Sequence, residues 1–221
     1  MDIFRGVYMK LIDMTVKDFV NEVDSNSPAP GGGSVAALAS DIGIGLSRMM
    51  AHLSFGKKKY EALDGDTKSE FEVKFDKLGK IRDELSRLVD EDTKSFNEFM
   101  KALKMPKDTF KQIIERQKAM TDATIYSIKT PYKTAILSLD AMKELEFLLD
   151  NGNQNAITDI GVGTLMLCTG LEGAILNVKV NLGNLEDKEL AKKYADSCSE
   201  MLEQGKEIRD KILNKIHSSI E

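Results

Sequence analysis

The apolar residues of this chain recur every three to four positions, which is the period of a helix with one buried face. No run of β-branched residues alternates with polar ones, so no β-strand is predicted. The pattern predicts helices over about residues 15–24, 34–54, 66–103, 106–120, 131–149, 154–182 and 187–220, with Pro106 and Pro131 each starting one. We therefore expect an all-α protein, an elongated helical bundle that forms one domain over residues 10–221. Residues 1–9 are expected to form a disordered leader.

The predicted helix over residues 34–54 carries two different faces. One is an ordinary apolar stripe, which comprises Val35, Leu38, Ile42, Leu46, Met49 and Leu53. The other contains only small residues, namely Ala36, Ser40, Gly43, Ser47 and Ala51. Glycine in a helix interior costs about 1 kcal/mol relative to alanine, so Gly43 and Gly45 require a compensating reason. Close packing against another helix, within the chain or across a dimer interface, is the favoured explanation. A helix backed against a ligand is the alternative.

An acidic residue interrupts the core face of the predicted helix over residues 66–103. Steps of three and four from Leu85 reach Leu88, then Asp92, then Phe96. Burial of an unpaired carboxylate costs several kcal/mol, so Asp92 is expected to be paired, to bind a ligand or to line a pocket. The structural alternative is a pair with a lysine or an amide of a neighbouring helix, or a position that merely flanks the seam.

The predicted helix over residues 154–182 has an unusual stripe beside its core face. The core face comprises Ile157, Ile160, Leu167, Leu171, Ile175, Val178 and Leu182. The stripe beside it comprises Asn155, Asp159, Gly163, Met166, Gly170, Gly173, Asn177 and Asn181. A solvated edge and a polar seam against another helix are two structural explanations. In the functional explanation the stripe lines a cleft, where the amides and the carboxylate bind a planar polar ligand such as a pterin or a purine.

A glycine-rich loop, Pro28-Ala-Pro-Gly-Gly-Gly-Ser34, directly precedes the predicted helix over residues 34–54. Its spacing matches neither a Walker A loop nor the dinucleotide-binding fingerprint. Glycines before a helix leave main-chain N–H groups free at the positive end of the helix dipole, where an anion or a carbonyl oxygen binds. A tight connection capped by Ser34 is the structural alternative. The three lysines at 57–59, beyond the other end of this helix, are either solvated or attract carboxylates of a ligand.

Composition narrows the chemistry that this chain can support. Its 221 residues carry a net charge of −5 and include only two cysteines, two histidines and no tryptophan. A mildly acidic chain does not suit a broad nucleic-acid interface. Two cysteines exclude a disulfide framework and fit a reducing, cytoplasmic environment, and a structural zinc site would need carboxylates as well. The most apolar stretch, residues 161–178, contains Glu172 and several glycines, so we expect a buried helix rather than a membrane span.

Five segments occur in an order that resembles one protein family. They are Pro-Ala-Pro-Gly-Gly-Gly-Ser-Val-Ala-Ala-Leu at 28–38, Gly-Lys-Lys-Lys-Tyr at 56–60, Asp-Glu-Asp at 90–92, Gly-Asn-Gln-Asn-Ala-Ile-Thr-Asp-Ile-Gly-Val at 152–162 and Asn-Val-Lys-Val-Asn-Leu at 177–182. Together they resemble the cyclodeaminase/cyclohydrolase family. That family comprises the cyclodeaminase half of formiminotransferase-cyclodeaminase and the stand-alone bacterial methenyltetrahydrofolate cyclohydrolases. The resemblance runs from about residue 10 to residue 216 and departs at Thr158, where the family often has serine.

The resemblance implies an all-α homodimer that binds a folate in a cleft associated with the dimer interface. It also implies an enzyme that acts at the 5,10-methenyl centre of tetrahydrofolate. The reaction is either that of a cyclohydrolase, which forms 10-formyltetrahydrofolate, or that of a formiminotetrahydrofolate cyclodeaminase, which releases ammonia. The tetrahydrofolate derivative is the substrate, and no metal or further cofactor is expected. No transferase half is visible, so a separate formiminotransferase would have to supply a cyclodeaminase with its substrate.

We predict that Asp92 and Asp159 are catalytic, one stabilising the cationic centre and the other acting as general acid and base. The predicted substrate-binding residues are Gly31, Gly32, Gly33, Ser34, Lys58, Tyr60, Asn153, Asn155, Asn177 and Asn181. Among these, the asparagines at 155, 177 and 181 would orient the pterin, residues 31–34 would hold an oxygen of the folate, and Lys58 would face its glutamate tail. The alternative class is a non-catalytic helical dimeric adaptor or a folate-binding protein. Neither a nucleic acid nor a membrane is expected as a partner.

Overall fold

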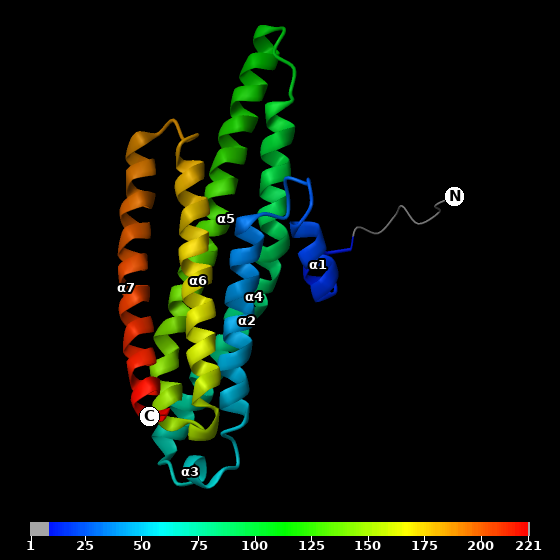
Figure 1. Ribbon diagram of the computed structural model, residues 1–221. Coiled ribbons are helices and arrows are strands. Elements are labelled where there is room, and N and C mark those ends of the chain that lie inside the picture. Colours follow the sequence, from blue (N-terminus) through cyan, green and yellow to red (C-terminus); the bar gives the residue numbers. More distant parts are fainter. Residues whose placement is uncertain (1–8, 221) are drawn as a thin grey trace, which may run out of the picture.

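The computed structural model describes residues 9–220, and every regular element in this range is a helix (Figure 1). In chain order the elements are η1 (Leu11–Asp13), α1 (Val16–Val23), α2 (Gly32–His52), α3 (Lys58–Glu61), α4 (Gly65–Leu103), α5 (Phe110–Asn151), η2 (Gln154–Ala156), α6 (Ile157–Leu182) and α7 (Lys188–Ile220). This confirms the all-α prediction for the described residues. The predicted leader over residues 1–9 lies outside them, apart from Met9.

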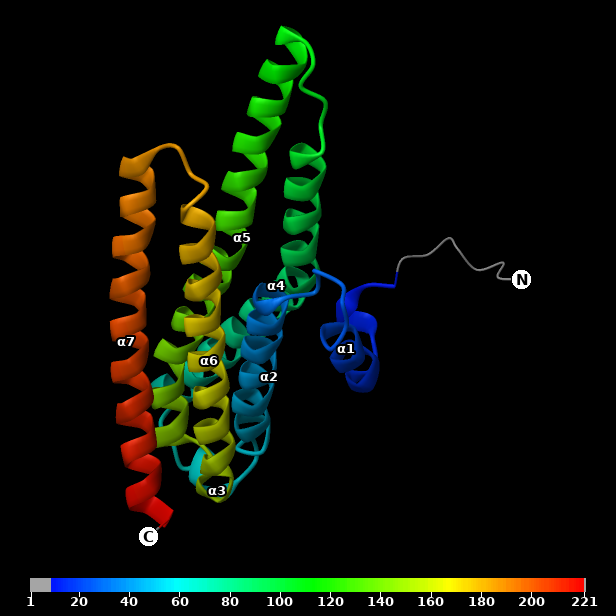
Figure 2. The ribbon, with the colours of Figure 1, turned by 45° about the horizontal axis from the view of Figure 1, so that its top comes forward.

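The five long helices form an elongated bundle with α6 at its centre. Helix α6 packs against α2, α5 and α7, and α4 packs against α2 and α5. Figures 1 and 2 show the α4–α5 hairpin projecting beyond the end of the α6–α7 pair, while the short α1 lies at the side of the bundle. The predicted core face of α6 is buried from Ile157 to Val178, because neighbouring helices cover it.

Helix α6 is also the one helix of the described residues that is long and apolar enough, by length and composition alone, to cross a membrane. Within the bundle, 56% of its most apolar window is buried. The packing of α6 among three other helices agrees with the prediction of a buried helix over residues 161–178.

Helices α2 and α6 run antiparallel and approach each other closely through glycines. A β-carbon on Gly43 would lie 2.7 Å from the carbonyl oxygen of Gly163. A β-carbon on Gly170 would likewise lie 2.6 Å from the carbonyl oxygen of Ala36. The two main chains are therefore in direct contact along this seam. The small-residue stripe of α2 packs within the chain, which was one of the explanations that the sequence favoured.

Most of the apolar stripe of α2 lies on the outside of the bundle, although Leu38 and Leu46 are partly buried. Four of the six residues of this stripe, and a matching set on α6, are between 39% and 70% exposed. We call this set the outer apolar face, and it comprises Val35, Ile42, Met49, Leu53, Val162, Leu165, Leu176 and Val180. The physical reason is that small residues let α6 approach α2 more closely than large ones would, so the small face points inward.

One continuous helix replaces the two that the sequence predicted over residues 106–149. Helix α5 contains Pro131 in its interior, and it begins after Thr109, whose side chain forms a capping box with Gln112. Proline has no N–H, so it leaves the carbonyl of Ser127, four residues earlier, without its helical partner. The side-chain amide of Asn181 in α6 donates to that carbonyl at 2.8 Å. A neighbouring helix thus replaces the lost hydrogen bond, and the helix continues through the proline.

We expect Gly43→Ala to destabilise the protein by about 1–3 kcal/mol, because the new methyl group would meet the main chain of α6. Gly45→Ala is the matched control in the same helix, since no atom lies within 4 Å of the added carbon. Alanine at position 45 should stabilise the helix by up to about 1 kcal/mol. Urea unfolding followed by circular dichroism measures both variants. Equal unfolding midpoints for the two would contradict the close α2–α6 contact.

Candidate functional site

Asp92 of α4 lies against the first turn of α2. Helix α2 begins at Gly32, two residues earlier than predicted, and its N-cap residue Gly31 has no side chain that could accept a hydrogen bond. The Asp92 carboxylate, which comes from the neighbouring helix α4, occupies the place of the missing capping side chain. A β-carbon on Gly33 would lie 2.5 Å from Oδ2 of Asp92 and closer still to Oδ1. The carboxylate therefore sits at the positive end of the α2 dipole, where a capping side chain would normally lie.

The side chain of Ser34 is fully buried at the same place. Its hydroxyl donates to the carbonyl oxygen of Val89 at 2.7 Å, and it lies 3.4 Å from Oδ2 of Asp92 and 3.2 Å from Oγ1 of Thr93. These contacts join α2 to α4. The sequence predicted that Ser34 binds substrate, but the structure turns its hydroxyl toward α4 and Asp92.

The position of Asp92 changes its acidity. Burial raises the pKa of the Asp92 carboxyl, and hydrogen bonding from the main chain and the hydroxyl of Ser34 opposes this rise. A half-buried carboxylate with a raised pKa exchanges a proton closer to neutral pH, and when ionised it interacts strongly with a nearby cation. This environment is compatible with the catalytic role that the sequence suggested for Asp92, which stays a prediction.

Asn177 of α6 approaches the same turn of α2 at the adjoining glycine, Gly32. A β-carbon on Gly32 would lie 3.1 Å from Nδ2 of Asn177. The same amide donates to the carbonyl oxygen of Gly173, one turn earlier in α6, at 2.9 Å, which orients the side chain. The structure therefore brings together several of the predicted site residues at one end of the α2–α6 seam. We call this group the first cluster, and it comprises Gly31, Gly32, Gly33, Ser34, Asp92, Asn177 and Asn181.

Asn181 has a structural role that the sequence did not reveal. Its amide nitrogen is bound to the carbonyl of Ser127, which Pro131 leaves unpaired. The prediction assigned this side chain to the pterin ring. The contact with α5 gives a structural reason for an asparagine at this point of α6, because an unpaired buried carbonyl would destabilise the fold. The role of Asn181 at the pterin stays a prediction.

The remaining predicted residues gather at the opposite end of the seam. A cavity of about 310 Å³ is lined there by Ser54, Lys57, Lys59, Tyr60, Gly152, Asn153, Gln154 and Asn155. Lys58, the lysine that the sequence prediction chose, is exposed but does not line the cavity, whereas Lys57 and Lys59 do. The lysine triplet was the signal for this region, but periodicity could not show which member faces the cavity. Asp159 lies in the first turn of α6 at this end but does not line the cavity. We call Lys57, Lys59, Tyr60, Asn153, Asn155 and Asp159 the second cluster.

Two members of the second cluster are held by protein groups. The Tyr60 hydroxyl donates to Oε1 of Glu72 at 3.0 Å, and burial, followed by the bond to Glu72, raises the pKa of Tyr60 to about 12. The Asn153 amide donates to the carbonyl oxygen of Leu53 at 3.0 Å and accepts from the main-chain N–H of Asn155. Both residues therefore shape the cavity, and Tyr60 stays protonated at neutral pH.

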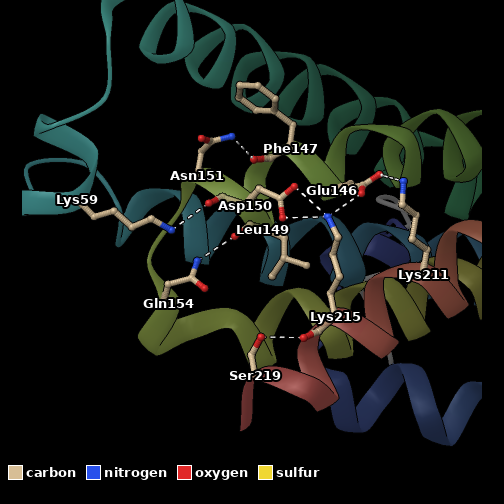
Figure 3. A network of polar contacts seen from close by, with 10 residues as sticks. All are labelled: Lys59, Glu146, Phe147, Leu149, Asp150, Asn151, Gln154, Lys211, Lys215 and Ser219. Atoms are coloured by element: carbon tan, nitrogen blue, oxygen red, sulfur yellow. Dashed lines mark hydrogen bonds and ion pairs between the residues drawn. The ribbon is translucent and has the colours of Figure 1, made fainter.

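An ion-pair network holds this end of the bundle together (Figure 3). Lys215 of α7 pairs with Glu146 at 2.7 Å and with Asp150 at 2.9 Å, and Lys211 pairs with Glu146 at 2.7 Å. Hydrogen bonding to Glu146 and Asp150 raises the pKa of Lys215, and the two lysines lower the pKa of Glu146. The Lys59 ammonium donates to the carbonyl oxygen of Asp150 at 2.9 Å. The network thus anchors Lys59 at the edge of the cavity.

A single chain does not bring the two predicted catalytic carboxylates together. Asp159 lies in the first turn of α6, and Asn177 lies near the other end of this helix. Their separation of 18 positions corresponds to about 27 Å along a helix axis. Asp92 belongs to the cluster at Asn177, so Asp92 and Asp159 lie at opposite ends of the α2–α6 seam.

Comparison with known proteins now identifies the family. Residues 15–200 match a family model described as formiminotransferase-cyclodeaminase. The chain belongs to this family.

Relatives of this chain include both long and short proteins. The formimidoyltransferase-cyclodeaminase of Gallus gallus is 32% identical over 89% of this chain, which spans only 36% of that protein. The methenyltetrahydrofolate cyclohydrolase of Methylorubrum extorquens is 28% identical, over 93% of this chain and 97% of its own length. The crystal structure of the formiminotetrahydrofolate cyclodeaminase of Thermotoga maritima superposes with a TM-score of 0.82 and 22% identity, covering 94% of this chain and 98% of that one. This similarity shows a shared fold.

We expect Asn181→Ala to destabilise the protein by about 1–3 kcal/mol, because the carbonyl of Ser127 loses its donor. In a Pro131→Ala background the restored main-chain N–H can pair with Ser127, so the same substitution should cost less than about 0.5 kcal/mol. Asn184→Ala, in the exposed loop after α6, serves as the control and should be neutral. Denaturant unfolding of the four variants measures the coupling. Additive effects of the two substitutions would show that Asn181 does not compensate for the proline.

Proposed function

We propose that this chain is an enzyme that acts at the 5,10-methenyl centre of tetrahydrofolate, as a methenyltetrahydrofolate cyclohydrolase or a formiminotetrahydrofolate cyclodeaminase. The observation that carries the proposal is the half-buried Asp92 carboxylate at the start of α2, beside the amide of Asn177. Family membership supports it. Both reactions have a named relative of similar length, the hydrolase in Methylorubrum extorquens and the deaminase in Thermotoga maritima.

The two reactions share one cationic species, the methenyl amidinium. In the deaminase, N10 attacks the formimino carbon on N5, and the bond to the departing nitrogen breaks once that nitrogen is protonated and leaves as ammonia. In the hydrolase, water adds to the methenyl carbon, loses a proton, and the bond from this carbon to N5 breaks to give the 10-formyl compound. Each reaction needs a negative charge near the amidinium and a group that transfers a proton. We assign these roles to Asp92 and Asp159.

We further propose that the site is completed between two copies of the chain. The outer apolar face runs along α2 and α6 between the two clusters, and its residues are too exposed to serve the core of one chain. In an isologous dimer each copy presents the same surface to the other, so an antiparallel contact places the first cluster of one copy opposite the second cluster of its partner. Asp159 of the partner subunit would then approach Asp92, although the two are far apart within one chain.

The same arrangement assigns parts to the other residues. The amides of Asn155 and Asn177 would orient the pterin from opposite sides of the cleft. Lys57 and Lys59, which line the cavity of the second cluster, would attract the glutamate carboxylates in place of Lys58. Tyr60 and Asn153 would shape this cavity through their contacts with Glu72 and Leu53.

We expect Asp92→Asn and Asp159→Asn each to lower turnover at least about a hundredfold, because each removes a charge or a proton-transfer group from the reaction. Asparagine keeps an oxygen that can cap α2, so Asp92→Asn should retain the fold. Loss of the near-ultraviolet absorbance of methenyltetrahydrofolate measures hydrolysis. Ammonia release from formiminotetrahydrofolate measures the deaminase reaction.

The matched control is Asp83→Asn, which changes a carboxylate of α4 whose side chain is 70% exposed. It should leave both rates unchanged. If Asp92→Asn and Asp159→Asn both keep near wild-type rates on both substrates, the catalytic assignment is wrong. If the wild-type protein turns over neither substrate, the proposed function itself fails.

Mixing the two inactive variants tests the shared site. In a mixed dimer of Asp92→Asn and Asp159→Asn chains, one of the two sites would combine an intact Asp92 with an intact Asp159. Random exchange of subunits makes about half of the dimers mixed, so about a quarter of wild-type activity should return. Analytical ultracentrifugation confirms that the chains pair. No recovery after complete subunit exchange would show that the two carboxylates do not act in one intersubunit site.

A further inference from the structure

We infer that Gly33 and Gly32 are positioning residues, which hold the Asp92 carboxylate and the Asn177 amide against the first turn of α2. The inference rests on the proposed function, because it gives the two glycines a part in placing the reacting carboxylate and its neighbouring amide. It also changes the role that the sequence suggested for the loop. The glycines make room for side chains from α4 and α6 rather than binding a folate oxygen themselves.

Gly33 leaves the space that Asp92 occupies. A β-carbon at this position would overlap the Cγ and both oxygens of the carboxylate. All three of these atoms belong to the end of a flexible side chain. A methyl group at Gly33 would therefore push the carboxylate away and leave the helices in place. At Gly43 the obstacle is the main chain of α6, so the same substitution there acts on the fold.

The space matters because the first turn of α2 has no cap of its own. Gly31 provides no side-chain acceptor, and Asp92 approaches the free N–H groups of this turn from α4. The groups that contact the carboxylate are uncharged, namely Gly33 and Ser34 on α2, and the Ser34 hydroxyl also lies 3.2 Å from Oγ1 of Thr93. The two preceding acidic residues of α4 point elsewhere, Asp90 to the N–H of Leu11 and Glu91 to Tyr126. The contacts with α2 therefore hold the carboxylate in place, where burial raises the pKa of Asp92 and the hydrogen bonds of Ser34 oppose this rise.

Gly32 has a milder effect on Asn177. A β-carbon there would lie 3.1 Å from Nδ2, a separation that a shift of a few tenths of an ångström would relieve. The substitution would move the amide slightly and leave the carboxylate in place. The two neighbouring glycines are thus predicted to affect different kinetic constants.

Three variants test this inference by steady-state kinetics. Gly33→Ala should lower kcat about a hundredfold, because a displacement of about 1 Å at a reacting group can cost that much. Gly32→Ala should raise KM several-fold with little change in kcat. Gly65→Ala is the control, since it also changes the first residue of a helix and no atom lies within 4 Å of its added carbon. It should behave like the wild type.

A titration of the ligand-free protein gives a readout that does not depend on activity. Carbon-13 NMR of labelled aspartates, with the Asp92 signal assigned by its absence in Asp92→Asn, reports the pKa of this carboxyl. In the wild type it should titrate above the usual aspartate range, because burial disfavours the charged form. If the reaction needs ionised Asp92, kcat falls as the pH drops through this raised pKa. In Gly33→Ala the carboxylate leaves its buried position, so its pKa and the acid limb of kcat should move to lower pH.

A stability cycle keeps the inference testable even if Gly33→Ala is poorly stable. The substitution should lower Tm when Asp92 is present and should not lower it in an Asp92→Ala background, where no carboxylate occupies the space. An equal loss in both backgrounds, or an Asp92 that titrates in Gly33→Ala as in the wild type, would overturn the inference. If the wild-type protein shows no turnover, the proposed function is refuted. The titration and the stability cycle then still test whether Gly33 positions Asp92.

Discussion

The close approach of α2 and α6 is the contact on which the rest of the structure depends. Two helices can come this near only where neither carries a β-carbon in the way, and Gly43, Gly163 and Gly170 supply those positions. With the small residues facing α6, Val35, Ile42, Met49 and Leu53 of α2 face outward, whereas Ile44 and Met50 of the same helix are buried. The same packing that builds the core therefore also creates an exposed apolar face along the length of the bundle.

The candidate site lies at the two ends of this contact, whereas the hydroxyls of Ser40 and Ser47 within the seam are fully buried and hydrogen-bonded to Ser138 and to the carbonyl oxygen of Gly43. At one end Asp92 uses the free N–H groups of α2, and the acidity of its carboxyl reflects a balance between burial and hydrogen bonding. At the other end lysines and amides surround a cavity that an ion-pair network of α5 and α7 helps to hold in place. A rigid seam keeps the ends about 27 Å apart, so chemistry that uses both ends calls for two chains.

Much of the fold was predictable because helical periodicity is a local property. Steps of three and four predicted both the core face of α6 and the carboxylate of Asp92 on the core side of α4. In the structure the core face of α6 is buried and Asp92 is half-buried. The predicted helix break at Pro131 was wrong. The hydrogen bond that the proline removes is replaced by one from Asn181, which lies 50 residues later in the chain. The orientation of Ser34 was likewise not readable, since its partners Val89 and Thr93 belong to another helix.

The sequence by itself determined the helical class, the short inventory of polar groups and the residues at which helical faces carry unexpected amides, glycines or a carboxylate. Periodicity reports which residues share a face, but it does not report which face a neighbouring helix will cover. Only the tertiary structure decided that the small face of α2 is buried and its apolar face exposed. It also decided that the predicted site residues divide between two ends of one seam, because the antiparallel contact of α2 and α6 places the start of each helix beside the end of the other.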